Sequence, residues 1–284
     1  VAACTGAMGR PETGMVVEGD FDFAATDWFF ERSGNRTMPS CVFMEALLQP
    51  CGWLSSYARD PGAQTTDIFF RNLDGKLTWS EEVRPQDGTL RVRTELTNWS
   101  ELGTMIIVGF RVEARLAGRV VATMETSFGF FPGDAFANQA GLAPSATERE
   151  YFAKDSATRL RLRGAEREAF PTVGAVLADD PLMMLDRVTG WWPEAGEAGL
   201  GLVRAEKDVA AADWFFQAHF MQDPVQPGSL GIEALVQLLQ CAMRLRGVGS
   251  EWGAAARFEP VALGEPLVWK YRGQVVPTNG LITT

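Results

Sequence analysis

An internal repeat constrains this chain more than any other feature, because two copies of one sequence unit predict two copies of one folded unit. The sequence Asp-Trp-Phe-Phe occurs at residues 27–30 and again at residues 213–216, an offset of 213 − 27 = 186. Further matches follow both copies at an offset of 227 − 39 = 188. These matches pair Pro39 with Pro227, Glu45-Ala46-Leu47 with Glu233-Ala234-Leu235, and Gln49 with Gln237. The first copy is therefore two residues shorter between its aromatic run and its proline.

The single histidine of the chain, His219, lies in the stretch where the first copy is shorter. A lone histidine in an apolar stretch is more often structural than catalytic. This one precedes the Pro227-Gly228 turn and an apolar helix predicted over residues 230–245. A helix start favours negative charge, and a base beside such a site is what proton abstraction next to a carbonyl needs. His219 is therefore the candidate base, and the backbone N–H of Gly228 is the candidate donor to the carbonyl oxygen.

The order of predicted elements is that of an α+β fold. A helix predicted over residues 38–57 precedes four strand-like segments, at residues 76–83, 89–96, 104–115 and 120–131. Strands predicted at residues 183–189 and 199–206 precede the second helix, and residues 266–276 begin the strands that return after it. We expect one unit over residues 1–134, a connection over 135–170 and a second unit over 171–284. The second unit has room for about two returning strands where the first has four, so we expect it to be truncated.

Composition excludes several classes of function. The formal net charge of −10 argues against binding to nucleic acid, which needs a basic face. No apolar run approaches the roughly 18 residues that span a membrane. The four cysteines show no C-x-x-C spacing, so we expect no metal site and a reducing, cytoplasmic location.

The segment from His219 through Pro227-Gly228 to Leu230-Gly231 resembles the active-site segment of the β-hydroxydecanoyl-ACP dehydratase/isomerase family. The repeat arrangement resembles the dehydratase didomains of polyunsaturated fatty acid synthases, in which a degenerate unit precedes a complete one. Further motifs that resemble this subfamily are Met38-Pro39-Ser40, Phe69 to Gly75, Glu125 to Phe131 and Trp269 to Gly273. The resemblance implies a double hotdog fold: two tandem hotdog units, each a curved antiparallel sheet wrapped around a central helix.

The resemblance also implies a site that is shared between the two units. His219 and Gly228 come from the second unit, and the acid, Glu45, comes from the helix of the first unit. Gln49, one turn beyond Glu45, is placed to orient its carboxyl group. Glu233 and Gln237 then face the position without a histidine, and we call this pair the pseudo-site.

The activity that the resemblance implies is removal of water from (3R)-3-hydroxyacyl-ACP to give trans-2-enoyl-ACP, without a cofactor. The implied partners are an acyl carrier protein, with its acyl chain on phosphopantetheine, and the other domains of a multidomain synthase. The monofunctional dehydratase/isomerases carry Asp where both copies here carry Glu, which leaves isomerisation open.

Two other functions stay open at this point. One is a thioesterase of the same fold, which would use a carboxylate and water; the Pro227-Gly228 turn after a histidine favours dehydration instead. The other is an acyl-binding or scaffold unit without catalysis, against which the retained His219, Gly228 and Glu45 argue. The aromatic runs could line an acyl tunnel, although such runs are more often plain core.

Overall fold

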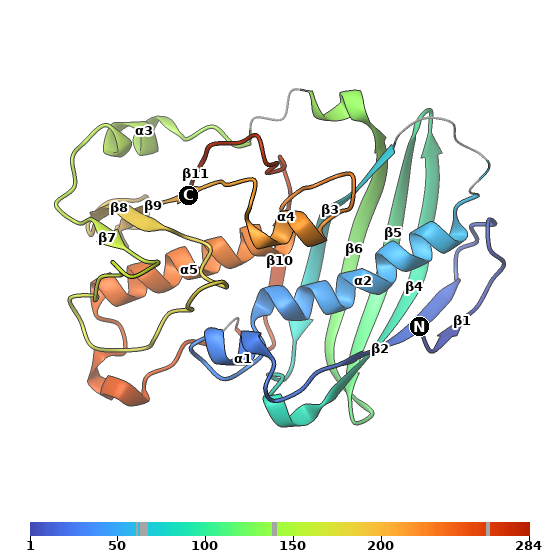
Figure 1. Ribbon diagram of the computed structural model, residues 1–284, viewed down its shortest axis with the longest axis horizontal. Coiled ribbons are helices and arrows are strands. Elements are labelled where there is room, and N and C mark those ends of the chain that lie inside the picture. Colours follow the sequence, from blue (N-terminus) through green and yellow to red (C-terminus); the bar gives the residue numbers. More distant parts are fainter. Residues whose placement is uncertain (61, 63–67, 138–140, 260–261) are drawn as a thin grey trace. The chain divides into compact units, whose positions relative to one another are not determined.

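The computed structural model describes residues 1–60, 62, 68–137, 141–259 and 262–284. The chain forms two compact units that interleave along the sequence (Figure 1). Unit 1 contains Val1–Asp27, Val42–Gln139 and Val261–Arg272, and unit 2 contains Trp28–Cys41, Ala140–Pro260 and Gly273–Thr284. Compared with the boundaries expected from the sequence, two short segments are exchanged: residues 28–41 belong with unit 2, and residues 261–272 belong with unit 1.

Unit 1 is built on a seven-stranded antiparallel sheet in the order β1-β2-β4-β5-β6-β3-β10. Its strands are β1 (Ala3–Cys4), β2 (Val16–Asp22), β3 (Ile68–Trp79), β4 (Thr89–Leu102), β5 (Met105–Leu116), β6 (Arg119–Pro132) and β10 (Pro266–Lys270). Buried and exposed residues alternate along much of β4, β5 and β6, as expected of a sheet with one face on the core.

The helix α2 (Ser40–Ala58) lies across the inner face of this sheet (Figure 1). Its apolar side chains fill the core of unit 1: Phe43, Leu47 and Leu54 are at most 2% exposed. The helix runs through Pro50 and ends within one residue of the predicted end. One helix against an antiparallel meander is the α+β arrangement that the sequence predicts.

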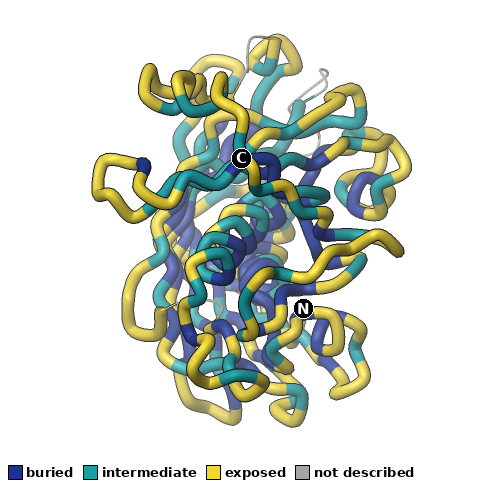
Figure 2. The backbone as a smooth tube through the Cα atoms, turned by 90° about the vertical axis from the view of Figure 1, so that its left-hand side faces the viewer, coloured by how far each residue is buried: buried dark blue, intermediate teal, exposed yellow. Residues whose placement is uncertain are grey.

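Unit 2 is built on a smaller sheet in the order β11-β9-β8-β7, with the long helix α5 (Gly228–Arg246) packed against β8 and β9. The remaining elements are β7 (Leu160–Arg161), β8 (Arg187–Trp192), β9 (Leu202–Asp208), β11 (Leu281–Thr283), α1 (Trp28–Arg32), α3 (Ala146–Phe152) and α4 (Trp214–Ala218). Cys241 of α5 packs with Leu185, Val188 and Ala205 in the core cluster of this unit. Figure 2 shows buried and exposed residues in alternation along the helices and strands, and mostly exposed residues in the protruding loops.

Both copies of the aromatic repeat fold alike, as the short helices α1 and α4 in unit 2. The indoles of Trp28 and Trp214 meet edge to face, with ring centroids 5.9 Å apart. The phenylalanines that follow are buried: Phe29, Phe30, Phe215 and Phe216. The phenylalanines of both runs are therefore core residues of unit 2, whereas Trp28 and Trp214 are 41% and 39% exposed.

The strand β10 differs most from the sequence-based expectation. The sequence pattern predicts that it opens the returning strands of the second unit, but it pairs with β3 in the sheet of unit 1. The indole of Trp269 lies over Gly75 on the neighbouring strand, and its Nε1–H donates to Asn72 Oδ1 at 2.9 Å. Such long-range pairing leaves no trace in local periodicity, so the sequence pattern could not reveal it.

Among the described residues, no helix is both long and apolar enough to cross a membrane.

The close approach of Trp269 to Gly75 leads to a prediction about stability. A Gly75→Ala methyl group would overlap the indole, so we expect the free energy of unfolding to fall by about 1–3 kcal/mol, the usual cost of overpacking. Urea unfolding of the purified chain measures this value. Gly19→Ala is the matched control, because a methyl group on this β2 glycine meets no atom within 4 Å. Equal stability of the two variants would contradict the packing argument.

Candidate active site

The imidazole of His219 is held at the end of α4 by a closed loop. The N–H of Val225 donates to the carbonyl of His219 at 2.8 Å, and His219 Nδ1 lies 2.8 Å from the carbonyl oxygen of Val225. A carbonyl oxygen can only accept a hydrogen bond, so Nδ1 carries the proton. In the neutral ring, Nε2 is then the unprotonated nitrogen, which is the form a general base requires.

The surroundings of His219 restrict the ring further. The side chain is partly buried, and the ring of Phe220 lies against it with centroids 3.8 Å apart. The helix α5 begins nine residues later at Gly228, with Pro227 as its N-cap. The N–H of Gln226 donates to the carbonyl of Val275 at 2.9 Å, which fixes the entry to the helix. The same segment of unit 2 thus carries a base and a helix start whose first N–H groups have no partner within the helix.

Glu45 and Gln49, the other predicted site residues, lie on α2 in unit 1. Glu45 is partly buried, while Gln49 is exposed one turn further along the helix. The pseudo-site residues Glu233 and Gln237 lie on α5 in unit 2, and both are buried. The two carboxylates of the repeat therefore differ in accessibility, although they occupy equivalent helix positions.

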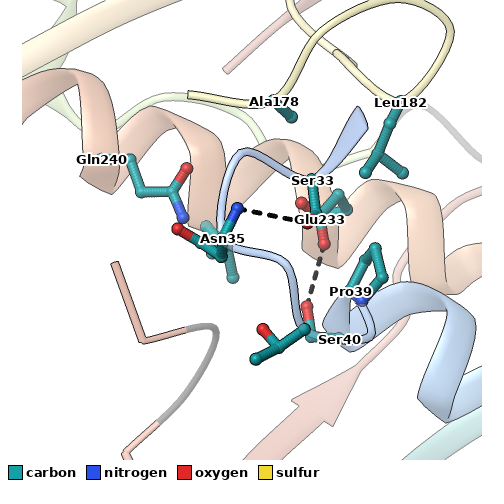
Figure 3. Close-up of a pocket in the computed structure, with 10 residues that line it drawn as sticks. Ser33, Asn35, Pro39, Ser40, Ala178, Leu182, Glu233 and Gln240 are labelled. Carbon is teal, nitrogen blue, oxygen red and sulfur yellow. Dashed lines mark hydrogen bonds between the residues drawn. The ribbon is translucent and has the colours of Figure 1, made fainter. Parts of the chain in front are cut away.

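Both oxygens of the Glu233 carboxyl group are hydrogen-bonded within unit 2. Ser40 Oγ–H donates to Oε2 at 2.9 Å (Figure 3). The Nε2–H of Gln237 donates to Oε1 at 3.0 Å. Gln237 is itself held, because it donates to the carbonyl of Leu182 at 3.0 Å and accepts from the N–H of Met184 at 2.7 Å. Every polar atom of this pair is thus tied to a fixed partner.

A further bond to Glu233 comes from the backbone N–H of Cys41 in the first turn of α2. The repeat pairs Pro39 with Pro227, so Ser40 stands where the second copy has Gly228. The helix start of the first copy is therefore occupied by the carboxyl group of Glu233. Reasoning from the sequence missed this role of Ser40, although a serine in place of the glycine was a visible signal.

The space beside Glu233 is a small polar pocket (Figure 3). Its volume is about 10 Å³, which leaves room for about one water molecule. The residues that line it are Ser33, Asn35, Thr37, Pro39, Ser40, Ala178, Leu182, Glu233, Val236 and Gln240. Such a pocket has no space for an acyl chain, so the pseudo-site is closed. No group of three His, Cys, Asp or Glu side chains gathers as metal ligands anywhere in the described chain.

Burial raises the pKa of Glu233 above its ordinary value, and the hydrogen bonds from Ser40, Gln237 and Cys41 offset only part of this effect. A carboxylic acid with a raised pKa holds its proton longer in the folded state than in the unfolded state. Folding is then favoured below the unfolded pKa of about 4.3, and this contribution is lost as the pH rises through the folded pKa.

In the parent chain, we expect the Glu233 contribution to the free energy of unfolding to fall as the pH rises above about 4.3. Glu233→Gln removes the titrating group, so the free energy of unfolding of this variant should fall less steeply with pH. Urea unfolding at a series of pH values measures the slope. Glu148→Gln is a control whose effect on the pH dependence has the opposite sign. Hydrogen bonds from Ser145 hold the pKa of Glu148 below its ordinary value, so the stability that Glu148 contributes is lost as the pH falls. An unchanged slope in Glu233→Gln would contradict the raised pKa of Glu233.

Known proteins resemble this chain along most of its length. The family model described as "FabA-like domain" matches residues 5–125 and 177–284. The chain is 32% identical over 288 residues to one of the subunits of the polyunsaturated fatty acid synthase of a Thraustochytrium species, with 95% of this chain covered. The alignment spans 19% of that relative, so the chain corresponds to about a fifth of its length.

Among solved structures, the fluoroacetyl-CoA thioesterase FlK aligns with a TM-score of 0.35 and 14% identity, over 44% of this chain and 91% of that chain. HtdX of Mycobacterium tuberculosis aligns with a TM-score of 0.32 and 13% identity, over 53% of this chain and 57% of that chain. The family model spans most of the sequence and matches it in two segments, one in each copy of the repeat. The protein therefore belongs to the FabA-like domain family, which confirms the resemblance found in the sequence and the double hotdog fold.

Proposed function

We propose that this chain is a dehydratase module that removes water from (3R)-3-hydroxyacyl chains held on an acyl carrier protein. The observation that carries the proposal is the position of Glu233. This carboxylate comes from the helix of the second copy, and its hydrogen bonds lead to Ser40 and Cys41, at the helix start of the first copy.

The repeat extends this relation to the other carboxylate. If Glu233 meets the helix start of the first copy, the equivalent Glu45 meets the helix start of the second copy, at Gly228 and Ser229. That helix start follows directly on the loop that holds His219. The bonds of Glu233, carried over by the repeat, thus support a proposed pairing of His219 with Glu45, in which the base and the acid come from different copies.

The proposed reaction uses each of these groups once. Nε2 of His219 removes the proton from the α-carbon, and the electron pair of that C–H bond forms the new double bond. The N–H of Gly228 stabilises the negative charge that develops on the thioester oxygen. Glu45 donates its proton to the β-oxygen as the C–O bond breaks, and water leaves. Gln49, one turn beyond Glu45, orients the acid.

A comparison of the two copies of the repeat explains why the chain would have one working site instead of two. The first copy has no histidine at the position of His219, and Ser40 replaces the glycine at its helix start. Glu233 is already bound there, so no acid is available to a substrate. The pseudo-site then serves the fold, while catalysis belongs to the second copy.

The cellular setting follows from the relatives. The relative that is named as part of a polyunsaturated fatty acid synthase supports a role as one module of a multidomain synthase. The net charge of −10 would not attract an acidic carrier protein, so a covalent tether within the synthase would supply the encounter. The cysteines at positions 4, 41, 51 and 241 are thiols, which suits our assignment to a reducing cytoplasm.

We expect His219→Ala and Glu45→Gln each to lower the rate of water loss at least about a hundredfold, because each removes a proton-transfer group. Glu233→Gln is the matched control: it makes the same chemical change at the equivalent helix position and should leave the rate within about twofold of the parent. Absorbance of the enoyl thioester measures the rate. Loss of activity in Glu233→Gln with activity kept in Glu45→Gln would overturn the proposed pairing.

The products separate dehydration from hydrolysis. Incubation with (3R)-3-hydroxyacyl thioesters should give trans-2-enoyl thioesters, detected by mass spectrometry as a loss of water. Release of a free thiol, followed with a thiol reagent, should stay at the level of His219→Ala. Thiol release above that level, without loss of water, would show a thioesterase and contradict the proposal. A shifted double bond in the product would show isomerisation as well.

A further inference from the structure

Tyr271 lies directly after β10, in the segment that joins the sheet of unit 1. Its N–H donates to the carbonyl of Leu73 at 2.8 Å, which continues the pairing of β10 with β3. Trp269, two residues earlier, is buried against Gly75. Because side chains alternate along an extended strand, Trp269 and Tyr271 point to the same, inner side of the sheet. The phenol therefore projects from the strand pair toward the face that α2 covers.

The hydroxyl group of Tyr271 is buried, and it finds no hydrogen-bond partner within the part of the chain that the structure describes. A buried hydroxyl without a partner costs free energy, so a role for it is expected. Burial raises the pKa of Tyr271, and the electrostatic interaction with Glu45 acts in the same direction. Tyr271 is therefore a neutral hydrogen-bond donor that interacts electrostatically with the carboxyl group to which we assign the acid role.

The repeat shows that this hydroxyl is not a general requirement of the fold. When Gly75 is aligned with Gly273, an offset of 273 − 75 = 198, Leu73 occupies the position of Tyr271. A leucine thus suffices in one copy, whereas the other copy carries a phenol near Glu45.

We propose that Tyr271 is a substrate-binding residue whose hydroxyl donates a hydrogen bond to the β-oxygen of a 3-hydroxyacyl chain. This inference rests on the proposed dehydratase function. The same oxygen accepts the proton of Glu45 when the C–O bond breaks, so a second donor would stabilise the charge that develops on it. It would also distinguish 3-hydroxyacyl chains from acyl chains that lack this oxygen.

Binding tests the inference without turnover. In the His219→Ala background, isothermal titration with (3R)-3-hydroxyhexanoyl-N-acetylcysteamine and with hexanoyl-N-acetylcysteamine compares chains with and without the β-oxygen. We expect the hydroxylated thioester to bind about tenfold more tightly, and Tyr271→Phe in this background to reduce the preference severalfold, with Glu45 supplying what remains. A preference that is unchanged in Tyr271→Phe would overturn the inference.

Turnover supplies the second readout. In the parent chain, Tyr271→Phe should lower kcat/KM for water loss by about 10–100-fold, because the lost hydrogen bond reaches an oxygen that gains charge. Tyr57→Phe is the matched control, since the Tyr57 hydroxyl donates to the carbonyl of Gly6 at 3.4 Å and should not affect kcat/KM. The Tm of Tyr271→Phe should stay level or rise, because a hydroxyl without a partner is removed.

The outcomes separate the two proposals. An active parent chain with unchanged kcat/KM in Tyr271→Phe would overturn the role of Tyr271 and leave the dehydratase function standing. A fall in Tm that accounts for the loss of activity would overturn it as well, by showing a structural role. A parent chain that removes no water would refute the dehydratase function, and the binding preference would then decide the role of Tyr271 alone.

Discussion

The pairing of β10 with β3 is the interaction on which the rest of unit 1 depends. Five residue pairs join the strands, from Pro266 with Thr78 to Lys270 with Asp74. The indole of Trp269 covers Gly75 and bonds to Asn72, which in turn donates to Thr126 Oγ1 on β6. A segment from the second copy of the repeat thus completes the sheet of the first. The pairing also brings Tyr271 into the same unit as Glu45.

Unit 2 likewise contains a segment from the other copy of the repeat. Residues 28–41 come from the first copy, yet they pack with the second, where Ser40 donates to Glu233. Each unit therefore combines a carboxylate from one copy with a segment of the other. In unit 2 the carboxylate is buried and every oxygen is bonded, whereas in unit 1 Glu45 is only partly buried and Gln49 is exposed. This difference in burial is the physical basis on which we propose Glu45 as the acid and Glu233 as a structural residue.

Much of this architecture could be predicted from the sequence. The apolar helix patterns gave α2 and α5 within a few residues, and alternation gave β4, β5 and β6. The repeat and the lone His219 indicated the segment to which we assign the base, and that assignment stays a prediction. The destination of β10 could not be predicted, because strand partners far apart in sequence depend on packing such as that of Trp269 on Gly75. The role of Ser40 was missed for a similar reason, since its partner Glu233 is 193 residues away.

The mutual exchange of segments has a consequence for the history of the chain. Two identical subunits that swapped these segments would form a symmetric homodimer with two equal sites. Duplication and fusion of the gene would keep both swaps, while each half became free to change by itself. One half could then lose its histidine and gain a serine without harm to the assembly. The closed pocket around Glu233 is what such divergence would leave: an ancestral active site converted into a piece of core.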